Sequence, residues 1–233
     1  MRLAPKLFPA ENIANLLPPV RTYTFDDALP AIPYQYFENA GAVPFEVDAR
    51  DCSLVNAWWL GDAAMLAYSG PHEIEAACAA AGFETVQFFS QQIPSRGTWF
   101  TGHSLGAGLA TLAAVEDGQA SGIYTFGSPR VGDDEFRKWF DSHFGTQAWR
   151  FVNNRDIISR MPLGDYEPVG GLKFIDGAGS IGNVEKSAET FEGLDSLIHL
   201  VREHAADHAP LRYQIHIWNE VVKSAPTSPK GTA

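Results

Sequence analysis

Two kinds of hydrophobic spacing alternate along this chain. Short segments rich in β-branched, aromatic and other apolar residues favour buried strands at residues 83–89, 98–101, 122–126, 149–153 and 172–175. Helical spacing and helix-forming residues predict helices at residues 52–68, 72–81, 106–115, 133–144, 194–204 and 211–223. The run at 172–175 is short, and we expect it at an edge of the sheet. Because strands alternate with helices, the pattern predicts an α/β fold with a mostly parallel sheet and helices on both faces.

The same pattern suggests three regions of unequal order. Residues 1–50 are rich in Pro, Tyr and Phe without clear periodicity, so we expect an irregular N-terminal arm. Residues 51–223 form the predicted α/β domain, and residues 224–233 form a flexible tail. The aromatic residues of the arm either line an acyl groove or pack the arm onto the domain, and packing is the commoner role for Tyr34, Tyr36 and Phe37.

A Gly-His-Ser-Leu-Gly sequence at residues 102–106 lies between a predicted strand and a predicted helix. This G-x-S-x-G pattern is typical of a nucleophile elbow, a sharp turn that exposes a serine hydroxyl above a helix N-terminus. Glycines at 102 and 106 are expected to let backbone approach where a Cβ would block it. Ser104 is therefore the candidate nucleophile, and it needs a base and a group that orients the base.

The orienting acid is expected between the serine and the histidine in chain order. Asp156 follows the predicted strand at 149–153, where the carboxyl edge of a parallel sheet would place it beside the elbow. It could equally cap a turn, and Asp176 in a glycine-rich loop is the second candidate.

Four histidines in the last third of the chain are candidates for the base: His199, His204, His208 and His216. His208 lies between two predicted helices, in a loop able to aim its ring at the sheet edge, and we favour it, with His204 second. These two are four residues apart and could share one helix face as metal ligands, but Pro210 breaks the helix nearby. We therefore expect no metal.

Composition narrows the other possibilities. The formal net charge of −11 argues against a polyanionic partner such as nucleic acid. The two cysteines, Cys52 and Cys78, are too few for a disulfide framework, and we expect both to be buried, unpaired groups in helices. No apolar stretch is long enough to span a membrane, and residues 1–17 lack the apolar core of a secretory signal. We expect a cytoplasmic protein, although a processed secreted form would have the same features.

Four motifs together resemble the class 3 lipase family of α/β-hydrolases. They are TGHSLGAGLATLAA at 101–114, YTFGSPRVGD at 124–133, RFVNNRDIISRMP at 150–162 and DHAPLRY at 207–213. The resemblance implies that Ser104 is the nucleophile, Asp156 the orienting acid and His208 the general base. It also implies that the backbone amide of Leu105 is one oxyanion donor and that His103 supports the turn. No cofactor or metal is implied.

The chain departs from this family immediately before the nucleophile strand. Members usually carry a strand ending in a Phe-Arg-Gly-Thr-like motif, followed by a lid helix and a further helix. Here Phe89 and Trp99 are only 10 positions apart, and residues 96–98 (Arg-Gly-Thr) directly adjoin the nucleophile strand. The α/β-hydrolase-like fold is therefore expected to be shortened here, and the second oxyanion donor stays unassigned.

We expect a serine hydrolase of carboxylic esters, either acylglycerols or short-chain esters, that makes transient contact with lipid surfaces. Because no amphipathic helix lies between Phe89 and Trp99, we expect little interfacial activation. The shortened segment also supports a second hypothesis, a weak or inactive lipase-like protein retained as a binding or scaffold protein.

Overall fold

A computed structural model describes residues 34–83, 97–184 and 205–224 of the chain. Its strands form one sheet in the order β1 (Trp99–His103), β2 (Gly122–Phe126), β3 (Ala148–Asn153), β4 (Gly171–Ile175) and β5 (Ile181–Gly182). The first four strands are parallel, and β5 pairs antiparallel with β4. The prediction of a mostly parallel sheet is confirmed. The expected edge position of residues 172–175 is wrong, because β5 covers the outer side of β4.

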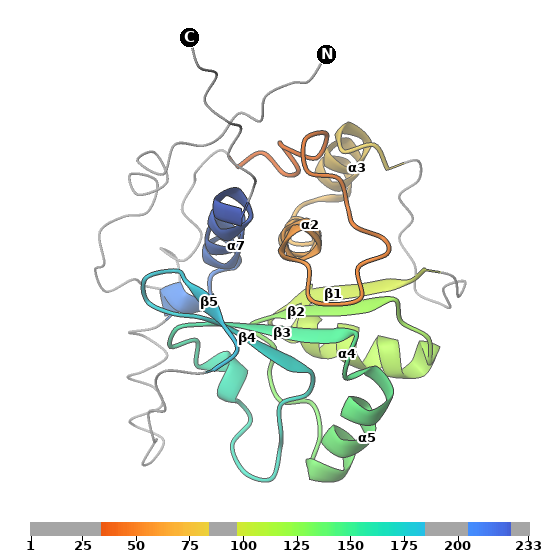
Figure 1. Ribbon diagram of the computed structural model, residues 1–233, viewed down its shortest axis with the longest axis vertical. Coiled ribbons are helices and arrows are strands. Elements are labelled where there is room, and N and C mark those ends of the chain that lie inside the picture. Colours follow the sequence, from red (N-terminus) through yellow and green to blue (C-terminus); the bar gives the residue numbers. More distant parts are fainter. Residues whose placement is uncertain (1–33, 84–96, 185–204, 225–233) are drawn as a thin grey trace, which may run out of the picture.

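Helices cover both faces of the sheet in the described ranges (Figure 1). One face carries α2 (Leu54–Leu66), α3 (Pro71–Ala80) and α7 (Pro210–Ser224), and the other carries α4 (Leu105–Asp117) and α5 (Asp134–Phe144). These helices lie where the hydrophobic spacing predicts them. Two short 3₁₀ turns, η2 (Ile158–Arg160) and η3 (Ala205–His208), complete the described elements. The predicted helix at 194–204 and nearly all of the predicted strand at 83–89 lie outside the described residues.

The strand β2 is buried along its whole length, as its uninterrupted apolar sequence predicts. On one face, Tyr124 and Phe126 of β2 pack with α2 and α7 around Ile217. On the other face, Ile123 packs with Phe140 of α5 and with α4. Both faces of the sheet are therefore apolar, which leaves the carboxyl ends of the strands as the place for polar side chains.

The residues before α2 are fixed to the domain through a buried carboxylate, that of Asp62. Its oxygens accept hydrogen bonds from Tyr34 Oη (2.6 Å), Phe37 N (2.7 Å) and Gln214 Nε2 (2.9 Å). The structure therefore supports packing, rather than an acyl groove, as the role of Tyr34 and Phe37. Burial of the carboxylate raises the pKa of Asp62 to about 7, against an ordinary value of 3.8, while the three hydrogen bonds act in the opposite direction.

Both cysteines are free, and each is half-buried rather than fully buried. Cys52 lies just before α2 instead of within it, because Ser53 caps that helix through a hydrogen bond from Asn56 N. Burial raises the pKa of both thiols, that of Cys52 to about 12, which leaves them protonated and unreactive at neutral pH.

The raised pKa of Asp62 predicts a pH-dependent stability with a definite sign. Because the folded-state pKa lies above the unfolded value, the contribution of this group to the free energy of unfolding is greatest below about pH 4 and falls as the pH rises through 7. The difference in unfolding free energy between the wild type and an Asp62→Asn variant should therefore decrease between pH 4 and pH 7. Urea unfolding at a series of pH values measures it.

An Asp165→Asn variant is the matched control, because Asp165 is exposed. Its difference from the wild type should not follow the same pH curve. A stability difference for Asp62→Asn that stays flat, or grows with pH, would contradict the assignment.

Candidate active site

A strained turn at the end of β1 holds the candidate nucleophile. Ser104 has φ 58° and ψ −128°, a backbone conformation that non-glycine residues rarely adopt, and its amide donates to Phe126 O at 3.0 Å. A Cβ at Gly102 would overlap the carbonyl of Gly106, so glycine is required at 102. At Gly106 a Cβ would meet nothing within 4 Å, so the expected steric requirement there is wrong. The prediction of an elbow between strand and helix is confirmed.

Three side chains predicted from sequence lie within hydrogen-bonding distance of one another. His208 Nε2 is 2.8 Å from Ser104 Oγ, and His208 Nδ1 is 2.8 Å from Asp156 Oδ2 and 2.9 Å from Oδ1. Because a carboxylate only accepts, Nδ1 carries the proton and Nε2 is free to accept from the serine hydroxyl. This is the tautomer in which an imidazole can remove the serine proton.

The carboxylate of Asp156 is fully buried, and three separate segments supply donors to it. Besides the His208 ring, Oδ1 accepts from Ile158 N at 2.9 Å and Oδ2 accepts from Tyr213 Oη at 2.5 Å. The Ile158 amide belongs to η2, which begins two residues after the aspartate. A buried carboxylate with this set of donors is held in one orientation.

Tyr213 is the residue of the site that sequence reasoning missed. It is fully buried in the first turn of α7, and its hydroxyl accepts from Asn153 N at 3.0 Å while donating to Asp156. Burial and the neighbouring carboxylate raise its pKa well above the ordinary value, so it remains a donor. The only available sequence signal is its position in the motif at 207–213.

Gly127, which follows β2, leaves the space that the pair of His208 and Asp156 occupies. A Cβ at this position would lie 2.6 Å from Asp156 Oδ2 and 3.0 Å from His208 Nδ1. The residue also has φ 57°, which favours glycine. In the sequence this glycine is distinguished only by its place in the motif at 124–133.

His103 supports the site from the position before the serine, as the sequence resemblance implies. Its Nε2 lies 2.7 Å from His208 O, which can only accept, so Nε2 donates and Nδ1 accepts from Tyr68 Oη at 2.8 Å. Burial lowers the pKa of His103 to about 4, which keeps the ring neutral in this arrangement. The end of β1 is thereby fixed to the backbone of His208, whose ring must reach Ser104.

The turn η3 that carries His208 is fixed to the end of β3. Asn153 Nδ2 donates to Asp207 O at 2.9 Å, and Asp207 Oδ2 accepts from Asn154 Nδ2 at 3.0 Å. His208 therefore ends a 3₁₀ turn rather than lying in an open loop, which corrects the sequence expectation. The His208 ring does point to Ser104 at the edge of the sheet, as expected.

The alternative candidates are placed elsewhere or lie outside the described residues. Asp176 closes the turn between β4 and β5 by accepting from Ala178 N and Ser180 N, each at 3.0 Å. His216 lies on α7 against Gly179 in that same turn, and burial lowers its pKa to about 4. His199 and His204 fall within residues 185–204, which the structure does not describe.

The candidate oxyanion donor, the Leu105 amide, lies at the start of α4. Leu105 is the first residue of α4, so its amide belongs to the helix turn that has no intrahelical acceptor. Most of the shortened segment before the nucleophile strand, residues 84–96, lies outside the described residues, so the second oxyanion donor stays unassigned.

Within the described ranges, no group of three or more His, Cys, Asp or Glu side chains is placed to hold a metal ion. Within the same ranges, no helix is long and apolar enough to cross a bilayer.

Sequence comparison gives relatives that match part of the chain. Phospholipase A1-II 1 of Oryza sativa subsp. indica is 40% identical over 83 residues, covering 33% of this chain and 21% of that protein. The secreted mono- and diacylglycerol lipase LIP4 of Malassezia restricta is 35% identical over 96 residues, covering 38% and 32% respectively. The lipase of Rhizomucor miehei is 41% identical over 80 residues, covering 31% and 22%. The chain thus spans a third or less of the length of each of these relatives.

The family model for Lipase (class 3) matches residues 52–166, which contain α2, the elbow and Asp156. The strand order, the helices on both faces and the elbow at a strand end form an α/β-hydrolase-like fold, as predicted from the sequence. Residues 52–166 of this chain thus match the class 3 lipase family, in agreement with the partial relatives.

Proposed function

We propose that this protein is a serine hydrolase that cleaves carboxylic esters through an acyl-enzyme on Ser104. The observation that carries the proposal is the unbroken hydrogen-bonded chain from Ser104 Oγ through the His208 ring to the buried Asp156 carboxylate. The match of residues 52–166 to a lipase family supports ester hydrolysis in general, whereas the roles of the individual residues rest on this geometry.

In the first half-reaction, His208 Nε2 takes the Ser104 hydroxyl proton as Oγ forms a bond to the ester carbonyl carbon. The imidazolium that results is stabilised by the Asp156 carboxylate on its other nitrogen. The carbonyl oxygen becomes an oxyanion, and the Leu105 amide, in the first turn of α4, stabilises it. The C–O bond then breaks, and the alcohol leaves with the proton from Nε2.

In the second half-reaction, water replaces the alcohol. Nε2 takes a proton from water as the hydroxide oxygen bonds to the acyl carbon, and the tetrahedral intermediate collapses to release the acid and restore Ser104. Every proton is transferred between Nε2 and oxygen, so neither a cofactor nor a metal enters the scheme.

The names of the relatives guide the substrate class. The Oryza sativa protein is named a phospholipase A1 and the Malassezia restricta protein a mono- and diacylglycerol lipase. We therefore propose acylglycerols or shorter carboxylic esters as substrates here. Three leucines at helical spacing on α4, immediately after the nucleophile, support transient contact with a lipid surface: Leu105, Leu109 and Leu112 are 72%, 58% and 48% exposed.

Removing the nucleophile gives the first test. Ser104→Ala should lower the kcat for a nitrophenyl ester by at least about 10³-fold, because no hydroxyl remains for His208 to activate. A fluorophosphonate probe should label the wild type at Ser104 and leave the variant unlabelled. Ser142→Ala, at an exposed position on α5, is the matched control and should keep full activity and labelling.

If the folded wild type neither hydrolyses esters nor reacts with the probe, the scaffold hypothesis holds instead. Full activity in Ser104→Ala would remove this serine from the mechanism altogether.

The hydroxyl of Tyr213 gives a second test, since it touches the acid but not the serine. Tyr213→Phe should lower kcat by about tenfold to a hundredfold, because a hydrogen bond to a charged group contributes about 1.5–3 kcal/mol. KM should change little, because the tyrosine holds Asp156 rather than the substrate. Tyr166→Phe removes a hydroxyl from a residue that is 45% exposed, and it should behave as the wild type. A Tyr213→Phe variant that raises KM and leaves kcat intact would refute this positioning role.

The exposed leucines give a third test, by co-sedimentation with phosphatidylcholine vesicles. Leu109→Glu should reduce vesicle association, because it introduces a charge into an apolar face, while hydrolysis of a dissolved short ester stays unchanged. Val184→Glu, at a residue that is 71% exposed near β5, is the control. Equal association of both variants and the wild type would exclude this face as the contact.

A further inference from the structure

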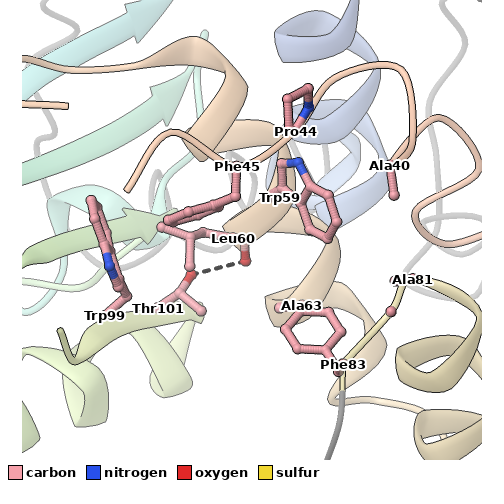
Figure 2. A pocket seen from close by; sticks show the side chains of 11 residues that line it. Ala40, Pro44, Phe45, Trp59, Leu60, Ala63, Ala81, Phe83, Trp99 and Thr101 are labelled. Atoms are coloured by element: carbon pink, nitrogen blue, oxygen red, sulfur yellow. Dashed lines mark hydrogen bonds between the residues drawn. The ribbon is translucent and has the colours of Figure 1, made fainter. Parts of the chain in front are cut away.

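Helix α2 is hydrogen-bonded both to the strand that leads to the serine and to α7. On the strand side, Thr101 Oγ1 of β1 donates to Leu60 O of α2 at 3.0 Å (Figure 2). Beside this bond, Trp59 and Ala63 line an aromatic-walled cavity of about 650 Å³ at the edge of β1. The bond fixes α2 along β1, because any sliding of the helix would separate the two atoms.

On the side of α7, the link is made by Gln214. Its Nε2 donates to Trp58 O at 3.0 Å and to Asp62 Oδ1 at 2.9 Å. The amide occupies the space that a side chain at Gly61 would take, since a Cβ there would lie 2.7 Å from Nε2. Both Gln214 and Asp62 are fully buried. The contact is therefore a closed polar junction inside an otherwise apolar helix interface.

This junction suits the control of position better than the gain of stability. A buried amide and carboxylate cost desolvation, and apolar contacts such as that of Trp58 with Trp218, whose ring centroids are 5.0 Å apart, already attract the helices. Apolar contacts tolerate small sliding and rotation, whereas two hydrogen bonds from one amide are directional. Gln214 Oε1 accepts from none of the described residues, so the group is not arranged for maximal stability.

The carboxylate that receives Gln214 is itself held in place by the residues before α2. Tyr34 Oη donates to Asp62 Oδ1 at 2.6 Å, and Phe37 N donates to Oδ2 at 2.7 Å. Phe37 has φ 56°, a conformation that costs free energy in a residue other than glycine, and its amide meets the carboxylate in that conformation. Gln214 therefore binds an acceptor that cannot turn away.

The residue next to Gln214 connects this junction to the candidate active site. Successive residues of a helix point about 100° apart, so one turn of α7 presents Gln214 to α2 and Tyr213 to the sheet. Tyr213 Oη donates to Asp156 Oδ2 at 2.5 Å and accepts from Asn153 N at 3.0 Å. A displacement of α7 by about 1 Å would exceed the range of both hydrogen bonds.

We infer that Gln214 is a positioning residue for the orienting acid, holding α7 against α2 so that the Tyr213 hydroxyl stays on Asp156. The inference rests on the proposed function and adds a residue to its machinery. Because α2 is bonded to both β1 and α7, it fixes the segment that holds the acid relative to the strand that ends at Ser104.

The main test replaces Gln214 by methionine, which has a similar volume and makes no such hydrogen bonds. Gln214→Met should lower the kcat for a nitrophenyl ester about threefold to tenfold with little change in KM, because the substrate is not touched. The midpoint of urea unfolding should stay close to that of the wild type. Gln119→Met, at an exposed position after α4, is the matched control and should keep the wild-type kcat.

A double variant tests whether the effect passes through the tyrosine. In the Tyr213→Phe protein, Gln214→Met should lower kcat by less than about a further twofold, because the hydroxyl through which it acts is already absent.

A second substitution keeps the inference testable if Gln214→Met fails to fold. Gly61→Ala favours the helical state of α2, but its Cβ must displace the Gln214 amide. It should therefore lower kcat with little change in KM, as Gln214→Met does. Gly182→Ala, where a Cβ would meet nothing within 4 Å, is the control and should leave kcat unchanged.

A measurement that needs no catalysis follows the same hydrogen bonds. The proton on His208 Nδ1, which the Asp156 carboxylate accepts, should give a far-downfield proton NMR signal in the wild type. Tyr213→Phe and Gln214→Met should both shift this signal, and Gln119→Met should not.

The outcomes separate the inference from the proposed function. A shifted signal in Gln214→Met, in a protein that hydrolyses no ester, would support the positioning role and reject the hydrolase. An active wild type whose kcat and NMR signal are unchanged in Gln214→Met and Gly61→Ala would support the hydrolase and overturn the inference. An equal loss of kcat from Gln214→Met with and without the Tyr213 hydroxyl would overturn it as well.

Discussion

The fully buried carboxylate of Asp156 is the constraint on which the described site depends. An anion without solvent is stable only when donors surround it, and here the donors come from η2, from α7 and from the histidine that ends η3. The hydrogen bonds to this one carboxylate therefore hold together segments more than 50 residues apart in the sequence, those of Asp156 and of His208 and Tyr213. The orientation of the histidine ring, and with it the direction of proton transfer, follows from the same hydrogen bonds.

A second set of contacts connects the two halves of the site. The ring of His103 joins the strand that ends at the elbow to the backbone of His208, and Tyr68 fixes that ring from the end of α2. Because burial keeps His103 neutral, it holds this arrangement without placing a second positive charge next to the base. The strained φ of Ser104 is supported by β2, whose Phe126 carbonyl accepts the serine amide.

Beside this polar centre, the molecule carries apolar surfaces that the core does not need. The α4 leucines face outward, and the aromatic-lined cavity lies at the outer edge of β1. Both adjoin the strand and helix that carry the serine. A polar reacting centre next to apolar surface suits a substrate with an ester group and a hydrocarbon chain, which is the chemistry that the proposed function requires.

The sequence by itself determined the local elements, because hydrophobic period, caps and glycines act within a few residues. The buried run of β2, the Asp133 cap of α5 and the strand–turn–helix around Ser104 are all examples. The order of Ser104, Asp156 and His208 along the chain also followed from motifs. Only the tertiary structure decided the contacts between distant segments, such as the Tyr213 hydroxyl on Asp156, the space left by Gly127 and the pairing of Asp62 with Tyr34. The sequence likewise did not predict that β4 lies inside the sheet, because β5 has only two residues and is too short to show a hydrophobic period.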